Sequence, residues 1–81
     1  MNEPFDIPVL YQGEELYFPA KLLQLGYTHH FRVDVYGIDV LFEPDEDRVY
    51  RAIIEPSQLQ SSKVEVELLK AISKAIDAIV N

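Results

Sequence analysis

Three glycines divide the first half of the chain: Gly13, Gly26 and Gly37. Glycine adopts at little steric cost the positive φ that a two-residue hairpin loop requires. Each glycine, together with the residue before it, can therefore close a tight loop between two antiparallel strands. The expected loops are 12–13, 25–26 and 36–37. This spacing predicts a meander of hairpins, and it leaves little room for any other fold in the first half of the chain.

The pattern of apolar residues supports this set of loops. The first loop places Ile7 opposite Phe18, the second places Phe18 opposite Val33, and the third places Val33 opposite Val40. All of these pairs are apolar, and because side chains alternate along a strand they share one face of a single sheet. A slip of one residue would move the whole set to the other face. The sequence therefore predicts a sheet with one continuous apolar face.

The segment after the third hairpin predicts a fifth strand. Residues 44–47 read Pro-Asp-Glu-Asp, a composition that favours a turn. A three-residue loop at 45–47 would place Phe42 opposite Tyr50 and keep the apolar residues on the same face. The expected strands lie at about 5–11, 14–24, 27–35, 38–43 and 48–54.

The last part of the chain predicts a helix at about 62–80. Ser62 is followed three residues later by Glu65, which is the spacing of a capping box. Apolar residues then recur at helical steps and form one stripe: Val64, Leu68, Ile72, Ala75, Ile76 and Ile79. An isolated helix of this length is marginally stable, so the stripe is expected to pack on the sheet. We expect residues 1–81 to form a single α+β domain, a five-stranded antiparallel meander with one C-terminal helix packed on one face.

Charge and cysteine content exclude several classes of function. The chain contains seven Lys and Arg and 14 Asp and Glu, which gives a net charge of −7 at pH 7. Nucleic acids and anionic membranes are bound by basic surfaces, so we expect neither as a partner. The absence of cysteine excludes disulfides, thiolate catalysis and cysteine-ligated zinc. The N-terminal segment has neither a basic leader nor a long apolar run, and we expect a cytoplasmic location.

Few residues offer catalytic or metal-binding chemistry. His29 and His30 are the only histidines, and as neighbours on a strand they point to opposite faces. The acidic turn at 45–47 lacks the glycine and glutamate that an EF-hand loop requires. The sequence contains no nucleophile elbow, glycine-rich phosphate loop or HExxH motif. We therefore expect a non-catalytic protein that uses no cofactor.

The face of the sheet opposite the apolar face, called here the outer face, is itself rich in apolar residues. The expected register places these residues there: Pro8, Leu10, Tyr17, Pro19, Leu23, Leu41, Val49 and Ile53, mixed with Arg32, Asp34, Asp39 and Arg51. Apolar side chains ringed by Arg and Asp suit a protein–protein interface, although monomers also expose apolar surface. We expect the domain to bind a protein partner or to form a homodimer through this face. The candidate interface residues are Tyr17, Pro19, Leu41, Val49, Ile53, Arg32 and Arg51.

Two carboxylates are expected to meet on the outer face. Asp34 and Asp39 are predicted to lie directly opposite each other, where like charges destabilise a sheet. Arg32, two residues before Asp34, and Arg51, diagonal to Asp39, are placed to balance them. The alternative is a small-ligand or divalent-cation module at Asp34, Asp39 and His30. Such a site would need its third ligand to converge on the other two.

One segment carries a resemblance to other proteins. Residues 40–46 read Val-Leu-Phe-Glu-Pro-Asp-Glu and precede a tyrosine-bearing strand and a terminal helix. This arrangement, over residues 31–80, resembles a group of short uncharacterised bacterial proteins in which a Phe-Glu-Pro-acidic turn links the last two strands. The resemblance implies a β-meander with a C-terminal helix. It implies no activity, because these proteins have no assigned one, and no functional residue is carried over.

Overall fold

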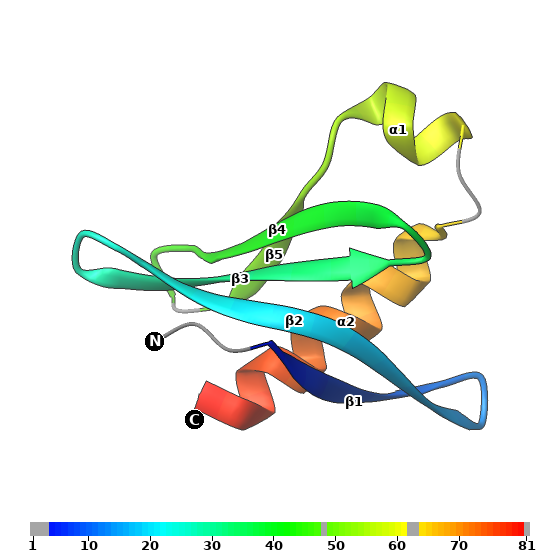
Figure 1. The fold of residues 1–81 in the computed structure, drawn as a ribbon, viewed down its shortest axis with the longest axis horizontal. Helices are drawn as coiled ribbons and strands as arrows, with labels where there is room; N and C mark the ends of the chain where they lie inside the picture. The colour runs from blue at the N-terminus through cyan, green and yellow to red at the C-terminus, as the bar shows by residue number, and fades with distance from the viewer. Residues whose placement is uncertain (1–3, 48, 62–63, 81) are drawn as a thin grey trace.

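The computed structural model describes residues 4–47, 49–61 and 64–80, and these form one antiparallel sheet and two helices. The elements are β1 (Phe5–Tyr11), β2 (Glu14–Leu25), β3 (Thr28–Val35), β4 (Ile38–Pro44), β5 (Tyr50–Ile53), α1 (Pro56–Ser61) and α2 (Val66–Val80). The strands follow one another in the order β1-β2-β3-β4-β5. The helix α2 packs against one face of the sheet, as Figure 1 shows. This is the two-layer α+β fold that the sequence predicts.

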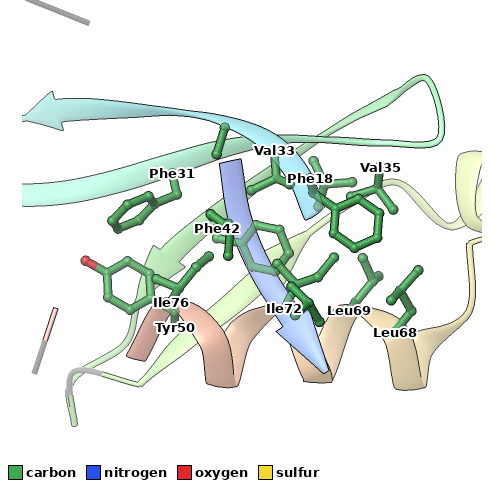
Figure 2. Packing of buried hydrophobic residues seen from close by; sticks show 14 of the residues in the cluster. Phe18, Phe31, Val33, Val35, Phe42, Tyr50, Leu68, Leu69, Ile72 and Ile76 are labelled. Atoms are coloured by element: carbon green, nitrogen blue, oxygen red, sulfur yellow. The ribbon is translucent and has the colours of Figure 1, made fainter. Parts of the chain in front are cut away.

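The hydrophobic core lies between α2 and the apolar face of the sheet (Figure 2). Ile72 and Ile76 of α2 are completely buried, and so is Phe42 in β4. Phe31 packs edge-on against Tyr50, with 5.4 Å between the ring centroids. The other large buried side chains come from β1 to β4 and from α2: Ile7, Val9, Phe18, Val33, Val35, Val40, Leu68 and Leu69. Burial of this apolar stripe stabilises a helix that would be marginal alone.

Both edges of the sheet contact α2. The most extensive contacts of α2 are with β1 and β5, the first and last strands of the sheet. The Tyr11 hydroxyl at the end of β1 donates a 2.7 Å hydrogen bond to Glu65 Oε2, just before α2 begins. The Tyr50 N–H at the start of β5 donates a 3.1 Å hydrogen bond to Asp77 Oδ1 near the end of α2. Each edge strand is therefore hydrogen-bonded to a carboxylate in or next to α2.

The first and third hairpins have the predicted register. Ile7 lies opposite Phe18, and Val33 lies opposite Val40. Both loops are of the two-residue kind, with positive φ at the glycine and at the residue before it, as a type I′ turn requires. The non-glycine residues that adopt this conformation are Gln12 (φ 51°) and Tyr36 (φ 53°).

The predicted register of the second hairpin is wrong by two residues. The loop consists of Gly26 and Tyr27, and Val33 lies opposite Ala20 instead of Phe18. Gly26 occupies the first loop position with a φ of 66°. The φ of Tyr27 is not positive, which is the pattern of a type II′ turn. Glycine is therefore the only residue of this loop that must adopt a positive φ.

The fourth hairpin is also shifted by two residues. Phe42 lies opposite Ala52 rather than opposite its predicted partner. The Asp45 carboxylate accepts hydrogen bonds from the N–H groups of Asp47 (2.8 Å) and Val49 (3.0 Å). The Asp45 N–H donates in turn to the Val49 carbonyl at 3.0 Å. An aspartate that begins a turn often bonds the backbone in this way, and here it closes the loop one residue later than predicted.

Both differences have one cause in the hydrogen-bonding geometry of antiparallel strands. The N–H and C=O of one residue point to the same neighbouring strand, and consecutive residues alternate between the two neighbours. Because Tyr11 and Glu14 flank the first loop and bond each other, the hydrogen bonds between β1 and β2 involve the even-numbered residues of β2. The hydrogen bonds between β2 and β3 must then involve the odd-numbered residues of β2. A loop at 25–26 would instead require the even-numbered residues, which already bond β1. A shift of two residues resolves the conflict and keeps every side chain on its predicted face.

The helix α2 begins later than predicted. Its first residue is Val66, and the predicted cap, Ser62, lies outside the described residues. Glu65 directly precedes the helix, and its carbonyl accepts a 3.2 Å hydrogen bond from the Leu69 N–H. Ile79, the last member of the predicted stripe, is 49% exposed, because the core ends at the preceding turn.

The short helix α1 was not part of the prediction. Its first residue is Pro56, in the segment between the predicted last strand and the predicted helix. Proline suits the first position of a helix, because its φ is already helical and its missing N–H would have no partner there. The Glu55 carbonyl accepts a 3.0 Å hydrogen bond from the Gln58 N–H. At six residues, α1 is too short to show an amphipathic period, and it stands apart from the sheet in Figure 1.

The hydrogen bond between Tyr11 and Glu65 predicts a loss of stability at high pH. This bond, together with burial and the charge of Glu65, raises the pKa of Tyr11 from 10.0 to about 12. The unfolded chain therefore loses the phenol proton before the folded chain does. The contribution to stability is complete below about pH 10 and is lost as the pH rises to about 12. We expect the thermal midpoint, followed by circular dichroism, to fall over this range.

The variant Tyr11→Phe tests this cause. Its thermal midpoint should fall less steeply between about pH 10 and 12 than that of the unchanged protein. Tyr50 should still contribute a decline in the same direction, because burial and then the charge of Asp77 raise its pKa. Tyr27→Phe is the matched control, since this phenol is fully exposed on a loop. Equal slopes for Tyr11→Phe and Tyr27→Phe would contradict the explanation.

Candidate protein-interaction surface

The outer face keeps several large apolar side chains exposed. The helix α2 covers the opposite face, where the core lies. On the outer face, Leu10 is 75% exposed and Tyr17 is 59% exposed. Ile53 at the far edge of the sheet is 43% exposed. Apolar exposure of this extent on one face is typical of a surface that meets another protein.

The structure places six of the seven predicted interface residues on the outer face itself. They come from four neighbouring strands, β2 to β5: Tyr17, Pro19, Arg32, Leu41, Arg51 and Ile53. Leu41 is the half-buried centre of this group, and the others are exposed. Val49, the seventh, precedes β5 and lines a groove beside α2. The two-residue shifts in register did not remove any of these residues from the face, because they preserve the alternation of side chains.

Ion pairs cross the strands of the outer face. Arg32 Nε lies 3.4 Å from Asp39 Oδ2, and Arg51 Nη2 lies 3.7 Å from Glu43 Oε1. His30 Nε2 lies 3.6 Å from the other oxygen of Glu43, and its side chain is only 12% exposed. The two pairs made by the exposed arginines contribute at most about 1 kcal/mol each. Their main effect is to place positive and negative side chains next to each other around the apolar residues.

The two predicted carboxylates do face each other, and each has a separate partner. Asp34 lies opposite Asp39 in the ladder between β3 and β4. Asp34 Oδ1 accepts a 2.8 Å hydrogen bond from the Gly37 N–H, and Asp39 is paired with Arg32. His30 lies beside Glu43 instead of joining the two aspartates. Within the described ranges, no three His, Asp or Glu side chains are grouped to hold a metal ion.

A hollow marks the point where β2 and β3 separate. Their ladder ends at Ala20, because the next residue, Pro19, has no N–H to donate to β3. The outer face is indented there by a hollow of about 500 Å³, lined in part by Pro19, Arg32, Asp34 and Asp39. Candidate residues of the interface hypothesis and of the small-ligand alternative therefore border the same depression. Its mixed charge and open shape suit a side chain of a protein partner.

The sequence interpretation missed the role of Asp77. This residue lies outside the apolar stripe of the predicted helix, but it is half-buried and accepts the hydrogen bond from the Tyr50 N–H. The N–H of Tyr50 points away from β4, toward the free edge of the sheet. A signal was present in the sequence, because a carboxylate near the C-terminus of a helix opposes the helix dipole. An acidic residue in that position indicates a partner elsewhere in the fold.

Comparisons with known proteins add no activity to this description. The Phe-Glu-Pro-Asp segment behind the resemblance to short bacterial proteins forms the end of β4 and the loop after it. That resemblance stays an expectation. Among the described residues, no helix is long and apolar enough to cross a bilayer. No family model, curated protein or solved structure matches the chain.

Proposed function

We propose that this protein is a non-catalytic protein-interaction domain that self-associates through its outer face. The observation that carries the proposal is the contrast between the two faces of the sheet. One apolar face is covered by α2, whereas the other exposes Leu10, Tyr17 and Ile53, and neither helix of the described residues packs over them. Full burial of one such side chain contributes about 1.5–3 kcal/mol, which gives the outer face a driving force for association.

The distribution of charge favours a second copy as the occupant. The chain carries a net charge of −7, so two copies repel each other over most of their surface. The outer face is different, because Arg32 and Arg51 lie among Asp34, Asp39 and Glu43. In a twofold dimer the same patch is used twice, so a patch with both signs can complement itself.

A dimer of standard interface size would use most of the outer face. A standard interface buries about 800 Å² on each partner. The molecule extends 32 by 27 Å across the view in Figure 1, in which the sheet is seen from the side away from α2. These are the extents of the whole molecule, so an interface of standard size would cover most of this side. The hollow next to Pro19 offers a place for a side chain of the second copy.

Light scattering on a sizing column, over a range of concentrations, tests the proposal. We expect a mass of twice 9.3 kDa at high concentration. Replacing Tyr17 and Leu41 together by aspartate should give a monomer, because both carboxylates would be buried in the dimer without partners. Both side chains lie on the face away from the core, so the monomeric variant should keep the circular dichroism spectrum of the folded protein.

The matched control is Tyr27→Asp. Tyr27 is an exposed aromatic residue on the loop between β2 and β3, away from the centre of the outer face. This variant introduces one carboxylate at an exposed tyrosine outside the proposed interface, and it should dimerise like the unchanged protein. A monomer at every concentration, or a double variant that still dimerises, would show that the outer face does not mediate self-association.

A further inference from the structure

The last strand of the sheet has a free edge. The Val49 carbonyl accepts a hydrogen bond from the Asp45 N–H, on the side of β4. Because consecutive residues alternate in direction, every second residue after Val49 also bonds β4. The backbone groups of Tyr50 and Ala52 therefore point away from β4. The N–H of Tyr50 is occupied by Asp77. The N–H and C=O of Ala52 have no partner among the residues that the structure describes.

A groove runs along this edge, between β5 and α2. It has a volume of about 450 Å³, and Ala52, Ile54, Val66 and Leu69 contribute its apolar lining. Leu69 forms part of the core, whereas Val66 is 50% exposed. An added strand beside β5 would place alternate side chains over this lining, because side chains of a strand alternate between two faces.

The groove is basic in an otherwise acidic protein. Three of the seven Lys and Arg residues line it: Arg51, Lys70 and Lys74. Asp77 is the only acidic residue of the lining, and its carboxylate is engaged by the Tyr50 N–H. Lys70 also lies 3.6 Å from Glu67, on the exposed side of α2. The groove therefore combines an unpaired backbone edge, an apolar floor and positive charge.

We propose that the β5 edge binds an extended acidic segment of a partner protein as a sixth strand. Apolar side chains of the segment would enter the groove, and its carboxylates would meet Lys70, Lys74 and Arg51. A second copy fits this edge poorly, because pairing of two β5 strands would bring the basic residues of both copies together. The edge of β1 is also unsuited to pair with it, because Pro8 interrupts the donors of that strand. This site shares Arg51 with the outer face, but its floor lies between β5 and α2, and it does not depend on self-association.

A labelled peptide of about nine residues serves as the probe, with Val at the central positions that would face the groove and Glu at the other positions, because such a length covers a typical strand. Binding is followed by fluorescence anisotropy at low and high salt. We expect saturable binding that weakens with salt. Two matched peptides provide controls, one with Lys in place of Glu and one with a central Pro. Neither should bind, because the first has the wrong charge and the second cannot pair as a regular strand.

Charge reversal in the groove tests the contribution of the lysines. The double variant Lys70→Glu, Lys74→Glu should weaken binding by about tenfold or more at low salt, because two attractive contacts become repulsive. Lys21→Glu is the control, since Lys21 lies on β2 and lines the hollow of the outer face instead. It should leave the affinity for the peptide nearly unchanged. An unchanged affinity for the double variant would overturn the proposal.

Two variants of Asp77 separate the backbone from the charge. Asp77→Asn removes the charge but keeps an oxygen that can accept the Tyr50 N–H. Asp77→Ala removes the acceptor as well and frees that N–H for the peptide. We expect Asp77→Ala to bind the Glu–Val peptide more tightly than Asp77→Asn does. Equal affinities would contradict strand addition at this edge.

Ala52→Pro removes the free donor directly. The Ala52 N–H points away from β4, so proline at this position leaves the ladder between β4 and β5 intact. Binding should be lost while the circular dichroism spectrum is retained. If the unchanged protein binds none of the peptides, or binds the Lys peptide equally well, the site is not one for acidic strands. Self-association that Ala52→Pro abolishes would assign the edge to a second copy and would also overturn the proposal.

Discussion

Replacing Ile72 by aspartate is expected to unfold the protein at neutral pH. Ile72 is completely buried at the centre of α2, facing the sheet. The change removes about 1.5–3 kcal/mol of apolar burial and places a carboxyl group in the core without a partner. A chain of this size is stabilised by about 4–12 kcal/mol in total. We expect a loss of about 5 kcal/mol or more, measured by urea unfolding.

Ile79→Asp is the matched control for this prediction. It makes the same change in the same helix, but Ile79 is 49% exposed, so the loss of stability should be small. The difference between the two variants should shrink below about pH 4, because the neutral carboxyl is cheaper to bury than the charged one. The sign follows from linkage, since burial raises the pKa of the introduced carboxyl above its unfolded value of about 3.9. Equal stabilities at neutral pH would mean that α2 does not close the core.

Phe42→Ala is expected to have the second largest effect. Phe42 lies at the centre of the sheet layer and is completely buried against α2 (Figure 2). Truncation of a buried phenylalanine costs about 3–5 kcal/mol, because the cavity that it leaves is filled only in part. For a domain of this size, such a loss lowers the thermal midpoint by more than about 12 °C. A calorimetric scan measures this shift directly.

Phe5→Ala provides the comparison for Phe42. Phe5 lies on the same face of the sheet but is 37% exposed at the start of β1. Its ring contacts Phe31 edge-on, with 6.2 Å between the centroids. We expect it to lower the thermal midpoint by less than half as much as Phe42→Ala. A larger effect for Phe5 would place the centre of the core nearer to β1 than the structure does.

The faces of the sheet could be derived from the order of residues alone. The spacing of Gly13, Gly26 and Gly37 set the number of hairpins, and the alternation of apolar side chains assigned each residue to a face. These are local properties, because they depend only on the pleat of a strand and the conformation of glycine. The helical stripe was local in the same sense. Two of its central members, Ile72 and Ile76, are buried as predicted.

The register between strands needed one further condition, which connects neighbouring hairpins. Each hairpin taken alone allowed a loop at 25–26 and a loop at 45–47. Taken together, the predicted loops violate the alternation of hydrogen bonds across β2 and β4, because the N–H and C=O of one residue cannot form ladder hydrogen bonds with both neighbouring strands. The type II′ turn at Gly26 and the bonds from the Asp45 carboxylate are the structures that satisfy this condition. It is a property of the whole sheet.

The partners of Asp77 and Tyr11 were outside the reach of sequence reasoning. Tyr11 is hydrogen-bonded to Glu65, 54 residues away in the sequence, and Tyr50 is hydrogen-bonded to Asp77, 27 residues away. Such contacts arise only after the sheet has folded onto α2, because no local rule states which helix residue will lie beside an edge strand. The groove along β5 has the same origin, since its lining comes from both layers. Local stereochemistry therefore determines the two faces of this protein, and only the packing of the two layers creates the groove along its edge.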